Sequence, residues 1–191
     1  MRDRDREMRQ FAETLIGPVR ERLSAASGGG HPDSAGEPPA DPEALFQDLV
    51  DSVRRWRGDR RIEVHRVHIP RQFRATGMWL ERADRDDVVI EQDAEIWHQA
   101  QILGHELWHI REKDGFASEQ LAACADLGPM DVHDAQPAAA RSRFDEDCEK
   151  EAELFGIRLG QQMRALMERD VITGETARRI ADSLNYRGNR R

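Results

Sequence analysis

Two histidines and a glutamate in "ILGHELWHI", residues 102–110, have the types and spacing needed to bind and use a metal ion. His105 and His109 are four positions apart, so on a helix their imidazoles project from one face. That separation suits two nitrogen ligands of a tetrahedral zinc ion, at about 2.0–2.1 Å from the metal. Glu106 lies about 100° further round the helix, where its carboxylate can take a proton from a water that attacks a carbonyl. The stretch predicts metal-assisted hydrolysis, with a solvated helix face as the alternative.

A third ligand would separate these two interpretations, and the candidates lie downstream. His133 and the acidic stretch "FDEDCEKEAELFG", residues 144–156, are available, and Cys148 within that stretch adds a thiol. The zinc proteases with a third histidine six residues after the second are excluded, because a glycine occupies that position. Glu149 and Glu153 are four residues apart and share one face of a helix. One carboxylate of this pair can bind the metal while the other holds the free ring N–H of a histidine.

The two stretches together resemble a known family. "HELWH" at 105–109, followed by "EKEAELF" at 149–155, is similar to the ImmA/IrrE family of metallo-endopeptidases, whose pattern is H-E-x-x-H and then E-x-E-A-(D/N)-x-F-A. The segment before the first motif also resembles the strand, turn and active-site helix of actinobacterial members. The resemblance covers about residues 43–170, and Gly156 stands where the family usually has alanine.

By matching positions, the resemblance implies a gluzincin-like zinc site, with manganese as the alternative metal. The implied ligands are His105, His109 and Glu149. Glu106 would be the general base. Glu153, at a position where relatives have aspartate or asparagine, would bind the ring N–H of a ligating histidine that does not face the metal. Glu151, two positions from Glu149 and on another side of the helix, is the competing third ligand.

The family also implies a function. Its members cleave a helix-turn-helix repressor, often encoded beside them, and some are toxin components of toxin–antitoxin-like pairs. The resemblance therefore implies a zinc-dependent endopeptidase that acts on a partner protein in gene regulation. The alternative is a regulatory binding module that keeps the metal and sequesters a repressor without cutting it. A purely structural zinc site is disfavoured, because such sites usually have four protein ligands.

The composition limits the partners that we expect. The chain has 191 residues and a net charge of -8, with its 29 basic residues spread among 37 acidic ones, so direct nucleic-acid binding is not expected. No stretch approaches the roughly 20 apolar residues of a membrane span, and the first residues form no hydrophobic signal. Two cysteines do not make a disulfide framework. We expect a cytoplasmic protein with no membrane association, and the sequence leaves its oligomeric state open.

The elements that must position these residues can be read from the sequence pattern. We expect an α+β fold in which a small, three-stranded, mostly antiparallel sheet packs beside the H-E-x-x-H helix and further helices. Segments rich in β-branched and aromatic residues predict strands at 61–69, 76–82 and 87–92. Helical spacing predicts helices at 95–111 and 143–169. Further helices are predicted at 42–58, with Asp41 as its cap, at 117–126 and at 173–184.

The domain organisation follows from shifts in composition. Apolar residues at helical spacing predict an amphipathic N-terminal helix at 1–26, with a break near Gly17-Pro18. Residues 27–42 are rich in glycine, proline and small polar residues and predict a flexible linker. The metallopeptidase domain is expected at 43–185, followed by a tail at 186–191.

Overall fold

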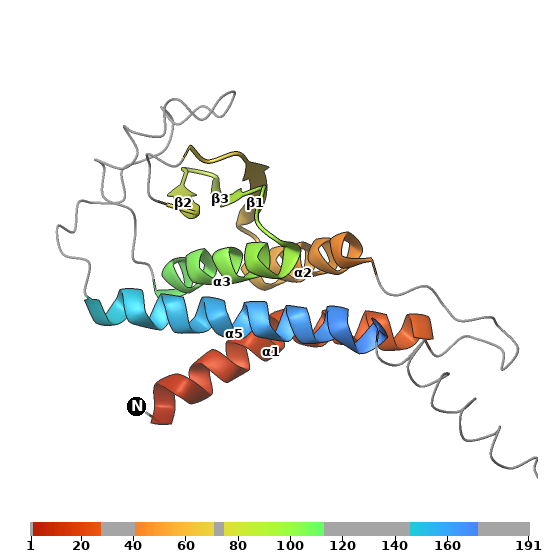
Figure 1. Cartoon of the computed structure of the whole chain (residues 1–191). Coiled ribbons are helices and arrows are strands. Elements are labelled where there is room, and N and C mark those ends of the chain that lie inside the picture. Colours follow the sequence, from red (N-terminus) through yellow and green to blue (C-terminus); the bar gives the residue numbers. More distant parts are fainter. Residues whose placement is uncertain (1, 28–40, 71–74, 113–145, 172–191) are drawn as a thin grey trace, which may run out of the picture.

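The computed structural model describes residues 2–27, 41–70, 75–112 and 146–171 (Figure 1). The elements in these residues are α1 (Arg2–Ser27), α2 (Pro42–Arg57), β1 (Arg61–Val67), β2 (Gly77–Glu81), β3 (Arg85–Glu91), α3 (Ile96–Glu112) and α5 (Glu146–Val171). The α+β class and the three-stranded sheet are therefore confirmed. The predicted helices at 117–126 and 173–184, most of the linker and the tail lie outside the described residues.

The sheet is mixed and has the strand order β1-β3-β2. β2 and β3 pair antiparallel, as the short connection between them requires. β1 pairs with β3 in parallel, with Val64 opposite Val88, so one of the two pairings departs from the mostly antiparallel sheet that we expected. β1 pairs with β3 and not with β2, which is the next strand in the sequence. Strand composition does not show which strands become neighbours, so it could not show this parallel pairing.

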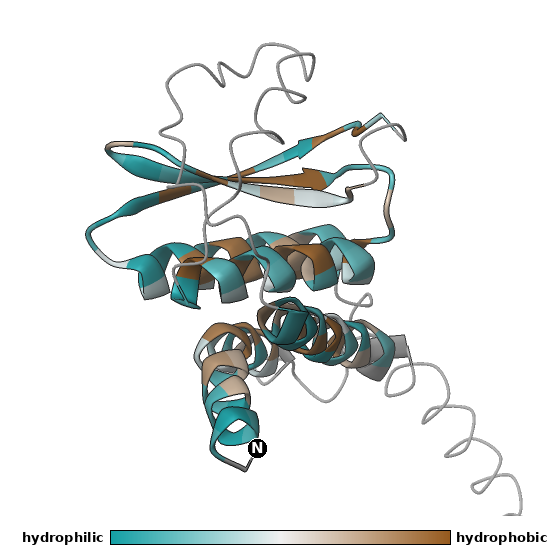
Figure 2. Ribbon diagram, turned by 90° about the vertical axis from the view of Figure 1, so that its left-hand side faces the viewer, coloured by the Kyte–Doolittle hydropathy of each residue, from teal (hydrophilic) through white to brown (hydrophobic). Residues whose placement is uncertain are grey.

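The helices lie in layers against one face of the sheet. Figure 1 shows α3 between the sheet and α5, and Figure 2, turned by 90°, shows the described helices together on one side of the sheet. Val88 and Ile90 of β3 point towards α3 and are fully buried, and Trp79 of β2 lies in the same core. The sheet therefore forms the support against which the helix with the H-E-x-x-H motif is held. None of the described helices is long and apolar enough to cross a membrane.

The N-terminal helix α1 is an integral part of the core. It packs against α2 and α5, and the rings of Phe11 and Phe155 stack with their centroids 4.8 Å apart. The predicted break at Gly17-Pro18 is wrong, because α1 continues through Pro18. Leu15, Ile16 and Val19 on either side are fully buried, and this burial offsets the backbone hydrogen bond that the proline removes.

Helix α2 has the ends that the sequence predicts. The Asp41 carboxylate accepts a hydrogen bond from the backbone N–H of Glu43 at 3.1 Å, and Pro42 occupies the first turn. The helix ends at Arg57, before Gly58, whose φ of 69° is a conformation that glycine adopts without strain.

A buried carboxylate joins the end of α2 to the sheet. Asp86 has no exposed surface, and its Oδ2 accepts hydrogen bonds from Arg57 Nε at 2.6 Å and from Arg60 Nε at 3.0 Å. Its Oδ1 accepts from the indole N–H of Trp79 at 3.2 Å. A buried charge is tolerated only with such partners, so this group fixes β2 and β3 relative to α2.

Replacing Asp86 with alanine is expected to lower the free energy of unfolding by about 3–5 kcal/mol, because it leaves two guanidinium groups without their buried partner. Denaturation in urea, followed by circular dichroism, measures the change. Asp84→Ala is the control, since that carboxylate is 71% exposed and lies 3.8 Å from Arg85. Equal stabilities for the two variants would contradict the structural role of Asp86.

Candidate metal centre

Helix α3 presents the two histidines of the motif on one face. Its start is fixed by the buried side-chain amide of Gln99, which donates to the carbonyls of Gln92 and Ala94 at 3.0 and 2.8 Å. About two and three turns after Gln99, His105 and His109 approach each other until their Nε2 atoms are 3.0 Å apart. Two imidazole nitrogens at this distance need a proton or a cation between them, because their lone pairs otherwise repel.

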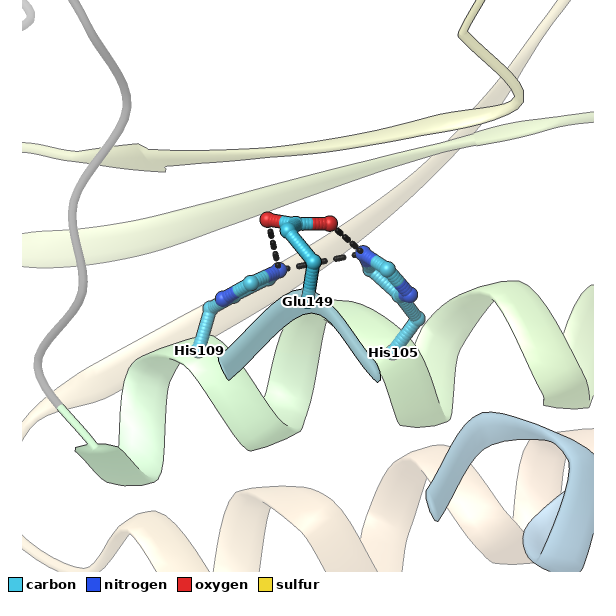
Figure 3. Close-up of side chains that lie close together, drawn as sticks. All are labelled: His105, His109 and Glu149. Atoms are coloured by element: carbon cyan, nitrogen blue, oxygen red, sulfur yellow. Dashed lines mark hydrogen bonds and ion pairs between the residues drawn. The ribbon is translucent and has the colours of Figure 1, made fainter. Parts of the chain in front are cut away.

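Glu149 of α5 completes a group of three potential ligands (Figure 3). Its Oε1 lies 3.3 Å from His109 Nε2, and its Oε2 lies 3.6 Å from His105 Nε2. Ligand atoms around a tetrahedral zinc ion are about 3.3 Å apart, since each lies about 2.0–2.1 Å from the metal. The three side chains, which come from segments about 40 positions apart in the sequence, therefore have the spacing of a zinc site.

The chemistry of this donor set also fits a divalent cation. Two neutral imidazoles and one carboxylate supply three ligands and one negative charge, as in catalytic zinc sites with an open fourth position. The His109 side chain is only 10% exposed, whereas the Glu149 side chain is 36% exposed. One side of the group is thus held in the protein and the other can be reached from solvent.

Glycines set the distance between the two helices that carry the candidate ligands. A Cβ atom on Gly156 of α5 would lie 2.6 Å from the carbonyl oxygen of Gln101 and 3.2 Å from the backbone nitrogen of His105. A Cβ on Gly160 would meet the Trp97 carbonyl oxygen at 3.0 Å. Glycine at position 156, where the resembling family has alanine, is therefore required by the close crossing of α3 and α5.

Glu106 lies beside the three potential ligands and is almost completely buried. Burial, followed in importance by the negative charge of Glu149, raises the pKa of Glu106 to about 8, against which a hydrogen bond from the Trp79 backbone acts. Its Oε2 has no hydrogen-bond partner among the described residues. A buried carboxyl oxygen without a partner is unusual and is typical of a group that takes part in chemistry.

Strand β2 comes close to α3 at this glutamate. A Cβ atom on Gly77 would lie 2.9 Å from Glu106 Oε1 and 2.4 Å from Ile102 Cγ2. Only a residue without a side chain fits here, so the glycine allows β2 to run directly beside the candidate general base.

The other predicted site residues have more distant or different contacts. Glu153 Oε2 lies 3.6 Å from His105 Nδ1, which is within ion-pair range but longer than a hydrogen bond. Glu151, the competing ligand, faces Arg4 instead, with its Oε1 3.2 Å from Arg4 Nε. Cys148 does not belong to the group of three, and His133 lies outside the described residues.

Two further groups of potential ligands have structural partners. In the group Glu63, His65 and Asp87, the buried Asp87 carboxylate is bonded by two arginines, so a cation there would be repelled. In the group His68, Glu91 and Asp93, both Glu91 oxygens accept hydrogen bonds from backbone N–H groups, one from Ile69 after β1 and one from Asp93 after β3. These contacts account for the carboxylates without a metal.

Comparisons with known proteins identified no relative of this chain. The chain matches no protein-family model, and no match to it was found among curated proteins or solved structures. The resemblance of the two motifs therefore stands on the residues themselves.

The sequence reasoning missed the residues that bring the site together. Gly77 falls within the predicted strand at 76–82, and Gly104 and Gly160 fall within predicted helices, so the local pattern assigns none of them a role in the site. A usable signal was present, because Gly156 and Gly160 are four positions apart and so form one smooth face of a helix. Small residues at this spacing are typical of closely packed helices.

Gly156→Ala is expected to separate α3 from α5, because the added methyl group has no space. The free energy of unfolding should fall by about 1–3 kcal/mol, as in overpacked cores. Zinc affinity should fall about tenfold, the range seen when the support of metal ligands is disturbed. Thermal unfolding and competition with a zinc-binding dye measure the two effects. Gln161→Ala, at an exposed position of the same helix, should change neither.

Glu106→Gln is expected to make the metal-free protein less sensitive to pH. The folded-state pKa of Glu106 is about 8 and its ordinary value is 4.5, so the folded state binds more protons between these values. The wild-type free energy of unfolding should therefore fall as pH rises through this window, by at most about 5 kcal/mol from this group. Glutamine does not titrate, so the free energy of unfolding of the variant should rise relative to that of the wild type as the pH increases through this window.

Denaturation in the presence of EDTA at about pH 5 and about pH 8 measures this difference. A difference between variant and wild type that stays constant across the window would show that Glu106 is not held in a desolvating environment. Repeating the series with excess zinc is a control, since a nearby cation favours the ionised carboxylate and should reduce the effect.

Proposed function

We propose that the chain is a zinc-dependent endopeptidase. The observation that carries the proposal is the approach of His105, His109 and Glu149 to within ligand spacing of one another, beside the buried carboxyl group of Glu106. A structural zinc site would not need Glu106, because Glu106 is not one of the candidate ligands. Manganese is the alternative metal, since the same ligand atoms also bind it.

The side chains have separate roles in this reaction. When bound, zinc supplies a Lewis acid that polarises a carbonyl group and lowers the pKa of a water molecule. Glu106 accepts a proton from the attacking water and passes it to the leaving amine, for which its unpartnered Oε2 is available. Glu153 faces Nδ1 of His105, so that Nε2 of the same ring is left for the metal.

Strand β2 offers a binding edge for the substrate. In the described part of the chain β2 pairs with β3 alone, and it lies against Glu106 at Gly77. An extended peptide segment can add to such an edge by backbone hydrogen bonds, which brings its carbonyl groups past the general base. A substrate that unfolds locally is therefore favoured over a rigid one.

The partner follows from the resemblance to the ImmA/IrrE family. We propose a helix-turn-helix repressor as the substrate, in a regulatory or toxin–antitoxin-like pair that acts in the cytoplasm. The repressor would supply the contact with DNA, since the charge of this chain is not suited to it. Cleavage of the repressor would then convert a signal into transcription.

Zinc-loaded protein is expected to cleave the repressor encoded beside it, and Glu106→Gln should slow this cleavage by about 10²–10⁴-fold while zinc content stays unchanged. His109→Ala and Glu149→Gln should lose zinc and activity together. Gel electrophoresis and mass spectrometry identify the products, and metal analysis gives the zinc content. Glu146→Gln, whose side chain is 90% exposed on the same helix as Glu149, is the control and should behave as wild type.

Two results would count against the proposal. A stable complex with the repressor and no product would favour a binding module that sequesters its partner. Undiminished cleavage by Glu106→Gln would remove the proposed general base.

A further inference from the structure

The first turns of α1 connect the two helices that carry the candidate ligands. Arg4 donates to Glu112 Oε2 at the end of α3, over 2.8 Å, and to Glu151 Oε1 near the start of α5, over 3.2 Å. Glu112 is three residues after His109, and Glu151 is two residues after Glu149. Figure 1 shows the N-terminal end of α1 on the same side of the molecule as these two helix ends.

Two further contacts hold this part of α1 in place. The Arg4 guanidinium lies 5.7 Å from the ring centre of Trp108, which is fully buried between the two histidine positions of α3. The neighbouring Asp5 accepts a hydrogen bond from Arg158 of α5 at 2.6 Å. The start of α1 is thus bonded to both helices that carry the candidate ligands.

This bridge supplies a constraint that the glycine contacts lack. The close crossing at Gly156 fixes how near α3 and α5 lie about two turns after Glu149, but this contact by itself does not oppose sliding of the first turn of α5 along the last turn of α3. A planar guanidinium that binds one carboxylate on each helix opposes such sliding. Sliding would change the distances from Glu149 to both imidazoles, because its position on α5 is fixed.

We propose that Arg4 is a positioning residue for the metal centre: by bridging Glu112 and Glu151 it fixes α5 in register with α3 and so determines the affinity for zinc. The inference rests on the metal site of the proposed function, although it does not depend on hydrolysis. It assigns the N-terminal helix a role in metal binding, beyond its part in the core.

The sign of the effect separates positioning from simple electrostatics. Removing the positive charge of Arg4 strengthens cation binding if only through-space repulsion counts. Removing the bridge weakens cation binding if the register of the two helices counts. Weaker zinc binding in Arg4→Gln therefore cannot come from the change in charge.

The experiment compares zinc dissociation constants of the full-length protein by competition with a chelating dye. Arg4→Gln is expected to bind zinc about fivefold more weakly, as for the loss of a partly exposed ion-pair network. Arg4→Lys keeps the charge but cannot bridge two carboxylates as a planar fork, so its affinity should lie in between. The absorption spectrum of the cobalt-substituted protein should change in Arg4→Gln, because the ligand geometry changes.

Arg22→Gln is the matched control. Arg22 also joins α1 to another helix, by donating to the Asp48 carbonyl of α2 at 2.9 Å, and its side chain is 39% exposed against 42% for Arg4. Its partner helix carries none of the three candidate ligands. Both glutamine variants should lower the unfolding temperature to a similar extent, and only Arg4→Gln should lower zinc affinity.

The outcomes are distinguishable from those that test hydrolysis. Unchanged or tighter zinc binding in Arg4→Gln, or equal weakening in both glutamine variants, overturns the positioning role while the metal site stands. If Arg4→Gln does not fold, a zinc affinity of Arg4→Lys equal to that of the wild type overturns the positioning role. A wild-type chain that binds no zinc overturns this inference and the metal site together, whereas zinc binding with the expected pattern and no cleavage overturns only the endopeptidase.

Discussion

The close crossing of α3 and α5 is the constraint on which the candidate metal centre depends. A Cβ atom on Gly156 would overlap the Gln101 carbonyl oxygen, and Gly104 and Gly160 meet the opposite helix almost as closely. Only at this separation does Glu149 reach both imidazoles with distances of 3.3 and 3.6 Å. The glycines at the crossing of α3 and α5 thus decide how closely Glu149 approaches the two histidines.

The crossing is supported from two sides, and each side combines apolar packing with charged contacts. On one side the sheet packs against α3 through apolar residues, and the buried Asp86 fixes the hairpin of β2 and β3 to the end of α2. On the other side α1 packs by aromatic stacking and bridges α3 and α5 through Arg4. Apolar burial provides most of the stability, while the charged contacts fix orientation, because they depend on direction and distance.

Glu106 shows how the same arrangement prepares a chemical group. Its carboxyl group lies between α3 and β2, where Gly77 leaves just enough room and the Trp79 backbone donates a hydrogen bond. Burial holds the pKa of Glu106 at about 8 in the absence of a cation. Keeping an acid in this place costs stability, and such a cost is typical of residues that are retained for function.

The sequence by itself determined the local features: the helix with both histidines on one face, the cap at Asp41, and three segments suited to strands. These follow from spacing and side-chain preference, which act between near neighbours. Only the tertiary structure decided that β1 pairs in parallel with β3, that α1 continues through Pro18, and that Glu149 faces the histidines while Glu151 faces Arg4. Each of these depends on packing between distant segments, whose relative position no local pattern encodes.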